Sequence, residues 1–119
     1  MSVAIVPLVS TTVAGTYVLP NDTAEHDVVE LLNAAGSAKD FTIRFDLSAI
    51  TKANFRLRLY FKINDSTYVL HTQNVFGIAD DAGQFEEPLT AYSIKVTAQS
   101  TIAEGATRNV PYKYSLVPR

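Results

Sequence analysis

The chain has 119 residues, a hydrophobic fraction of 47% and a formal net charge of −2. This length and composition predict one globular domain with its own core, and the charge argues against a nucleic-acid partner. The absence of cysteine excludes a disulfide scaffold, a thiolate zinc site and a cysteine nucleophile.

Residues 1–10 are expected to form an N-terminal arm or an edge strand, because Pro7 interrupts their β-prone run. The arm would contact a partner through its apolar residues, or the same residues would form the first strand of the domain itself. No cationic segment precedes the run, so we expect no signal peptide. No stretch approaches the ~20 apolar residues of a membrane span, so we expect no membrane partner. The candidate arm residues are Val3, Ile5, Val6 and Leu8.

Residues 11–115 are expected to be one β-sandwich domain. Thr11–Leu19 is β-branched and aromatic, which predicts a strand, with Gly15 at a bulge or a close approach. Glu25–Asn33 fits a helix face or a strand, and its shortness among strands favours a strand. Phe41–Leu47 alternates between apolar and polar residues, as a half-buried strand does.

Phe55–Phe76 is the strongest local signal in the sequence and predicts a β-hairpin. Its strands are expected at about Phe55–Ile63 and Tyr68–Phe76, around a polar turn at 64–67. Apolar residues alternate in the first strand with arginine, tyrosine and lysine, so one face should be buried and the other cationic. The inward set is Phe55, Leu57, Leu59, Phe61 and Ile63.

The remaining chain is expected to contain an acidic loop at Gly77–Pro88 and strands at Leu89–Gln99 and Arg108–Ser115. Residues 116–119 read LVPR, which is what thrombin leaves after removal of a C-terminal tag, so we expect a tag remnant there. About seven to nine short strands without a sustained helix predict an all-β fold. The fold class is a single antiparallel β-sandwich or jelly-roll-like domain.

The residues offer no clear catalytic or metal site. Asp80, Asp81, Glu86 and Glu87 could hold calcium, but their spacing matches no calcium loop and a solvated loop is the better interpretation. His26 and His71 could be drawn into a metal site or a Ser-His-Asp set, but neither lies in a supporting motif. The sequence therefore predicts no enzyme and no cofactor.

Basic residues are expected to point outward from the strands, whereas the acidic residues lie mainly in loops. This separation suggests an assembly face that meets the acidic loops of a neighbouring copy, or an anionic partner. The simpler interpretation is edge protection and solubility. The residues of the candidate face are Arg44, Arg56, Arg58, Lys62, Lys95 and Lys113.

Three segments resemble small virion-associated β-sandwich proteins of bacteriophages. They are FTIRFDLSAIT (Phe41–Thr51), FRLRLYFKINDSTYVL (Phe55–Leu70) and SIKVTAQSTIAEGATRNVPYKY (Ser93–Tyr114). The resemblance implies a non-enzymatic structural protein, most simply a capsid decoration protein. It also implies a homo-oligomer, with a trimer favoured, and a major capsid or other virion protein as partner. The protein would be made in the host cytoplasm and located in the virion.

The alternative function is a carbohydrate- or receptor-binding module of a phage tail or fibre. It would use exposed tyrosines together with loop acids, because flat aromatic rings and carboxylates are the groups that bind sugars. The absence of tryptophan weakens this alternative. The tyrosines concerned are Tyr60, Tyr68, Tyr92 and Tyr112.

Overall fold

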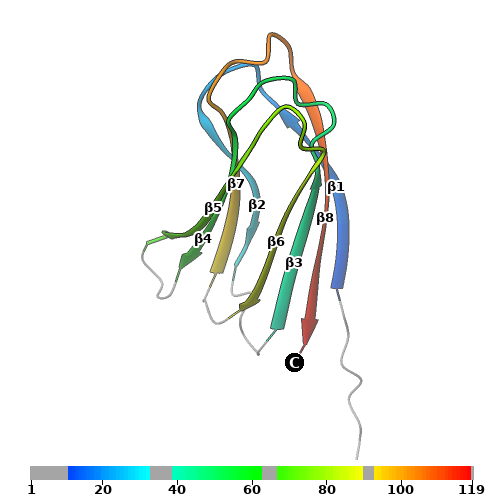
Figure 1. The fold of residues 1–119 in the computed structure, drawn as a ribbon. Coiled ribbons are helices and arrows are strands. Elements are labelled where there is room, and N and C mark those ends of the chain that lie inside the picture. Colours follow the sequence, from blue (N-terminus) through cyan, green and yellow to red (C-terminus); the bar gives the residue numbers. More distant parts are fainter. Residues whose placement is uncertain (1–10, 33–38, 63–66, 90–92, 119) are drawn as a thin grey trace, which may run out of the picture.

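A computed structural model of the chain describes residues 11–32, 39–62, 67–89 and 93–118. These residues form eight β-strands (Figure 1). The bounds are β1 Thr11–Leu19, β2 Glu25–Leu31, β3 Lys39–Asp46, β4 Phe55–Lys62, β5 Val69–Phe76, β6 Ala82–Leu89, β7 Ser93–Ser100 and β8 Arg108–Pro118. The described part of the chain contains no helix, and so none that could cross a membrane.

The strands form two four-stranded sheets that pack face to face. Sheet A has the order β1-β8-β3-β6 and sheet B the order β2-β7-β4-β5, and every recorded pairing is antiparallel. The pairings β4 with β5, β3 with β6, β2 with β7 and β1 with β8 are nested around the hairpin. This confirms the predicted antiparallel β-sandwich.

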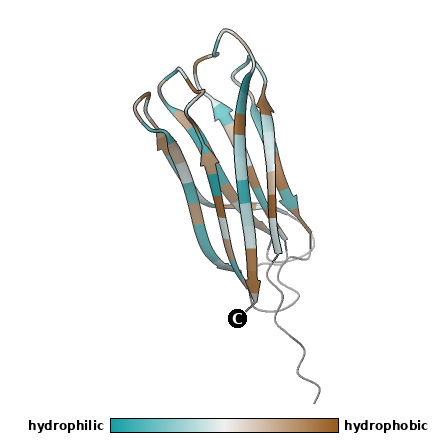
Figure 2. Ribbon diagram, turned by 90° about the vertical axis from the view of Figure 1, so that its right-hand side faces the viewer, coloured by the Kyte–Doolittle hydropathy of each residue, from teal (hydrophilic) through white to brown (hydrophobic). Residues whose placement is uncertain are grey.

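The core lies between the sheets and follows the period-two pattern of the sequence. Phe41, Ile43 and Phe45 of β3 face Leu57 and Leu59 of β4 across it, and all five are almost fully buried. Apolar and polar bands alternate along the strands in Figure 2. A strand with one face in the core and one in water shows this alternation, and burial of the apolar face provides the main stabilisation.

The predicted hairpin is confirmed as β4 and β5, and the strand interpretation of Glu25–Asn33 is confirmed as β2. Residues 63–66, which include the predicted inward Ile63 and most of the turn, lie outside the described residues. β7 is flanked by β2 and β4, and its outward-facing Ser93 and Thr97 are buried, whereas Lys95 and Gln99 on the same face are half-buried. Burial of these two polar residues was not expected from their alternation with apolar ones.

The predicted acidic loop at Gly77–Pro88 is wrong for most of its length, because β6 begins at Ala82. The segment reads as a loop since it is rich in charge and contains a glycine and a proline. β6 is an edge strand, however, where outward charges are solvated and a proline is tolerated. The predicted strand Leu89–Gln99 is divided instead, because β6 ends at Leu89 in sheet A and β7 begins at Ser93 in sheet B.

Two glycines allow aromatic rings to pack directly on the backbone. A Cβ on Gly15 would lie 2.6 Å from the phenolic oxygen of Tyr112, its partner on β8. A Cβ on Gly83 would lie 2.8 Å from Cζ of Phe76, which reaches across from the other sheet. The continuous register of β1 shows that Gly15 marks a close approach rather than a bulge.

Candidate functional site

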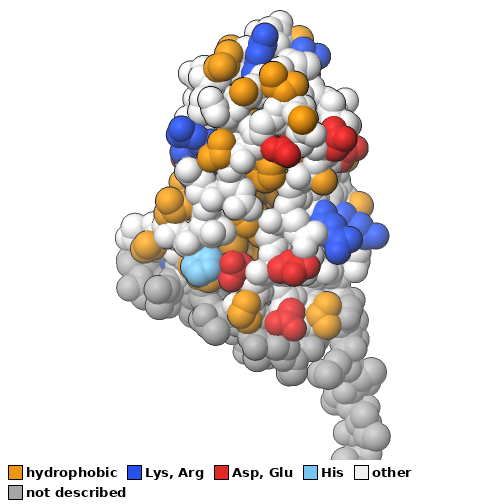
Figure 3. Space-filling view, in the orientation of Figure 1, with side chains coloured by type: hydrophobic (Ala, Val, Ile, Leu, Met, Phe, Trp, Pro, Cys, Tyr) orange, Lys and Arg blue, Asp and Glu red, His pale blue; other side chains and the backbone are white. Residues whose placement is uncertain are grey.

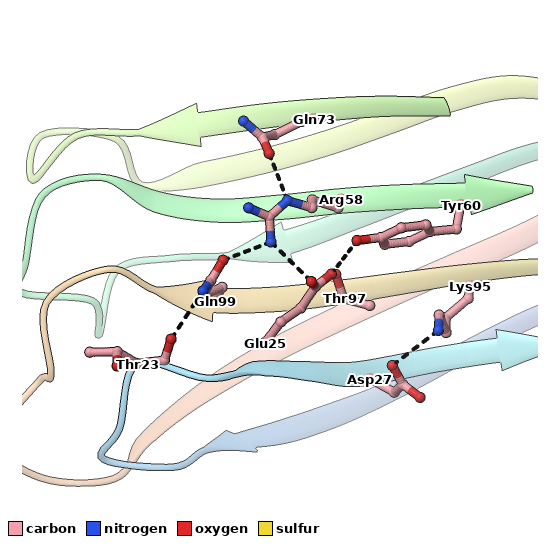
Figure 4. A network of polar contacts seen from close by, with 9 residues as sticks. All are labelled: Thr23, Glu25, Asp27, Arg58, Tyr60, Gln73, Lys95, Thr97 and Gln99. Carbon is pink, nitrogen blue, oxygen red and sulfur yellow. Dashed lines mark hydrogen bonds and ion pairs between the residues drawn. The ribbon is translucent and has the colours of Figure 1, made fainter. Parts of the chain in front are cut away.

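The most extensive polar arrangement in the described residues covers the outer face of sheet B (Figure 4). Strand register creates it, because Asp27, Thr97 and Arg58 occupy directly opposed positions on β2, β7 and β4. Gln73 of β5 lies opposite Arg58 and continues this row to the far edge. Side chains from all four strands of the sheet are therefore in contact.

Glu25 and Arg58 are the centre of this network. Arg58 Nη1 lies 3.1 Å from Glu25 Oε1 and donates to Gln99 Oε1 at 2.7 Å, while Arg58 Nε donates to Gln73 Oε1 at 2.6 Å. The other carboxylate oxygen of Glu25 accepts from Tyr60 Oη at 2.6 Å and from the hydroxyl of Thr97. This donor set fixes both oxygens of a single carboxylate.

The surroundings hold Glu25 in its charged form. Burial acts to raise the pKa of Glu25, but the hydrogen bonds from Thr97 and Tyr60 and the positive charge of Arg58 outweigh it, so the pKa is lowered. Burial and the Glu25 hydrogen bond raise the pKa of the Tyr60 hydroxyl, which therefore stays a donor. The network is satisfied internally and needs no bound ion to balance it.

A ladder of alternating ammonium groups and rings lies beside the network. Lys95 Nζ is 5.2 Å from the ring centroid of Tyr60 and 4.7 Å from that of Tyr68, and Lys62 Nζ is 4.5 Å from the Tyr68 centroid. Lys95 also lies 3.6 Å from Asp27 Oδ1. These are cation–π contacts that stabilise the sheet face. Burial and Glu30 raise the pKa of Tyr68 to about 12.

A shallow hollow of about 270 Å³ lies within this ladder, and its lining includes Tyr60, Tyr68, Asp27 and Lys95. Tyr60 and Tyr68 therefore lie close together on the outer face of sheet B. The ammonium groups over their rings occupy the faces on which a sugar would stack. Tyr112 packs against the core from sheet A, and Tyr92 lies outside the described residues. The four tyrosines do not form one binding surface.

The structure does not bring the six predicted assembly residues onto one face. Arg56, Arg58, Lys62 and Lys95 lie on the outside of sheet B, whereas Arg44 and Lys113 oppose each other on the outside of sheet A. The prediction of a single cationic face is wrong, because β3 and β8 belong to the other sheet. Arg58 and Lys95 are also paired with Glu25 and Asp27 of the same molecule.

The acidic residues of 77–88 do not form a cluster either. Asp80 accepts a hydrogen bond from the Gly77 backbone at 2.7 Å in the turn before β6. Glu87, near the other end of β6, lies 3.2 Å from His71 Nε2. His26 pairs with Asp22 at 2.8 Å on the opposite edge of sheet B. Within the described residues no group of three or more potential ligands is placed to hold a metal ion.

One functional-looking residue was missed by the sequence analysis. Glu104 lies in the loop before β8, where acidic residues are usually solvated, but only 4% of it is exposed. Its Oε1 accepts from the backbone nitrogen of Thr51 at 2.7 Å and lies 3.5 Å from Arg108 Nε. Glu104 thereby joins the loop after β3 to the loop before β8. No local pattern signals this contact, since its partner is 53 positions away.

Two further predictions concern the candidate N-terminal arm and the expected tag remnant. The candidate arm residues Val3, Ile5, Val6 and Leu8 lie outside the described residues. The expected tag remnant begins within β8, where Leu116 pairs with Thr11 of β1 and Phe41 of β3. Its origin as a tag stays a prediction, because pairing in a strand does not depend on where the residues came from.

Comparison with known proteins gives a structural likeness. No protein-family model and no curated protein matches the sequence. Among solved structures, the fold is similar to a chain from the work titled "Bacillus endospore appendages form a novel family of disulfide-linked pili". The TM-score is 0.57 at 10% sequence identity, over 99% of this chain and 98% of that chain. At this identity the likeness establishes the shared fold.

Proposed function

We propose that this chain is a non-enzymatic structural protein that assembles with further copies of itself. The observation that carries the proposal is the whole-length likeness to the pilus chain, which covers 99% of this chain and 98% of that one. The satisfied network on sheet B fits a structural role, because its polar groups bind each other.

Assembly of this chain would be noncovalent. The solved pili are described as disulfide-linked, but this sequence contains no cysteine. Contacts between copies would therefore rest on strand edges, apolar side chains and charges. A head-to-tail contact produces a closed ring, such as the trimer expected from the sequence, or an open polymer, according to whether the rotation between copies closes.

Light scattering and negative-stain electron microscopy over a wide concentration range test the proposal. We expect the mass to rise above that of the 13.0 kDa monomer, with particles or filaments of regular repeat. A monomer at all concentrations, with no regular particles, would overturn self-assembly. The measured mass also distinguishes a trimer from an open polymer.

The narrower proposal from the sequence resemblance is capsid decoration on a phage head. The solved structure that resembles this chain is described as a pilus protein, so this proposal rests on the sequence resemblance alone. Co-sedimentation with phage capsids tests it separately.

Glycan binding is disfavoured by the ammonium groups over Tyr60 and Tyr68. A glycan array tests this alternative, with Tyr60→Ala as the control.

A further inference from the structure

Among the described residues, four strand edges of the sandwich leave backbone groups without a neighbouring strand. They belong to β1 and β6 in sheet A and to β2 and β5 in sheet B. An unpaired edge accepts another extended chain unless charges, a proline, a bulge or a covering group prevents it. The four edges differ strongly in this protection, which indicates where a second copy can bind.

β2 and β6 are protected edges. β2 carries three carboxylates and its register shifts between Asp27 and Val29, as at a β-bulge. β6 carries Glu86, Glu87 and Pro88, and Asn74 Nδ2 donates to its Gln84 carbonyl at 3.3 Å. An added strand would have to desolvate charges on β2 and displace a hydrogen bond on β6.

β5 is the least protected edge, since it carries no carboxylate or proline and its one register shift, at His71, lies ahead of the run Thr72–Phe76. Its sequence VLHTQNVF contains no carboxylate, lysine, arginine, proline or glycine. Val69, Leu70 and Val75 are exposed by 57%, 48% and 51%. Hydrophobic side chains follow the left side of Figure 3, where Figure 1 places β5. β1 is also uncharged, but Val18 is its one large hydrophobic residue among the exposed ones of the described chain.

The regular part of β5 has a defined length. The pairing with β4 skips His71, since Leu59 pairs with Thr72 and Tyr60 with Leu70. The stretch from Thr72 to Phe76 is therefore the longest uninterrupted run of the edge. In the N-terminal segment, the run from Ser2 to Val6 is also five residues long before Pro7 removes a backbone donor.

We propose that the N-terminal segment of a second copy, residues 2–6, adds a strand to β5 along Thr72–Phe76. The proposal rests on the proposed self-assembly and names its contact. The segment SVAIV is uncharged and β-branched, so it matches an edge without charges. Backbone hydrogen bonds supply affinity in strand addition and alternate side chains supply specificity. Val3 and Ile5 would share one face of the added strand.

Two full-length variants test the contact against a matched control. Val75→Lys places a charge on the exposed outer side of β5, and Val3→Asp with Ile5→Asp places charges on the segment. Thr16→Lys places the same charge as the first variant on the outward face of the β1 edge. We expect at least a tenfold weaker association for the first two and no change for Thr16→Lys, measured by sedimentation equilibrium.

Amide hydrogen exchange provides the second readout. An excess of a synthetic peptide of residues 1–10 should slow exchange at Thr72–Phe76 in the full-length protein and should compete with assembly. Assembly that is insensitive to Val75→Lys but lost in Thr16→Lys would overturn the proposal while self-assembly stands. Absence of both assembly and peptide protection would overturn self-assembly and the contact together.

Discussion

At the scale of single residues, the packing of side chains over Thr97 on β7 determines which substitutions in sheet B destabilise the fold. Thr97 is 1% exposed although it points away from the core, because Glu25, Arg58 and Tyr60 lie over it. A charged group held in this way is stabilised by several partners at once. Removing one partner leaves the others partly unsatisfied, which costs more than the loss of a single surface ion pair.

Glu25→Gln should lower the free energy of unfolding by about 1–3 kcal/mol at pH 7. The lowered pKa of Glu25 means that the carboxylate stabilises the fold above its unfolded-state pKa, about 4.3, and that this contribution is lost as pH falls through the folded-state pKa. The deficit of the variant should therefore shrink toward pH 3. Urea unfolding at both pH values measures it.

Asp81→Asn is the control for this experiment, because Asp81 is exposed before β6. We expect it to match the parent protein within about 0.5 kcal/mol at either pH. A Glu25→Gln deficit that persists unchanged at pH 3 would show that shape rather than charge matters. Arg58→Glu should also lower the free energy of unfolding, because it would place a second carboxylate beside Glu25.

The alternation of apolar and polar residues predicts which side chains are buried in the core, but it does not predict the polar network on sheet B. Alternation alone identified the buried Leu57, Leu59 and Val96. It could not reveal that Thr97 is buried on the polar side, because that depends on which strands flank β7. Glu104 shows the same limit, since its burial follows from a contact with Thr51 made across two loops.

At the scale of elements, edge protection explains why β6 has an unusual sequence for a strand. Glu86 and Pro88 make it read as a loop, yet Gly83 and Phe85 face the core and are buried. Charges and proline on an edge prevent unwanted pairing. The features that concealed β6 from sequence analysis are thus the ones that keep this edge from associating.

Replacing Glu86 and Pro88 by valine should open β6 to association. Both residues are exposed in the described structure, so the substitutions should leave the core packed. We expect a new concentration-dependent dimer or aggregate, seen as an increased sedimentation coefficient. Thr42→Val on the neighbouring internal strand β3 is the control, because β3 is already paired on both sides. Unchanged sedimentation of the double variant would contradict the protective role.

At the scale of the whole molecule, the absence of cysteine limits the proposed assembly to noncovalent contacts. A polymer held by strand addition and apolar contact responds to denaturant and not to thiols. The fold class was predictable from strand count and alternation, but the strand order was not. Pairing of β1 with β8 joins residues nearly a full chain length apart, and no local pattern specifies such a pairing.

Reducing agent should leave any assembly of this protein intact, whereas urea below the unfolding midpoint should dissociate it. The reason is that noncovalent contacts between folded copies are weaker than the core that holds each copy together. Light scattering with dithiothreitol, and then with urea, measures both. Dissociation by dithiothreitol alone would contradict the prediction.

The place of β8 in sheet A has a consequence for folding. β8 lies between β1 and β3, and among the described strands β1 pairs with β8 alone. β1 therefore cannot join sheet A until β8 has formed beside β3. Folding that waits for distant partners is slow, so the pairing of β1 with β8 should be among the last steps that close the sandwich.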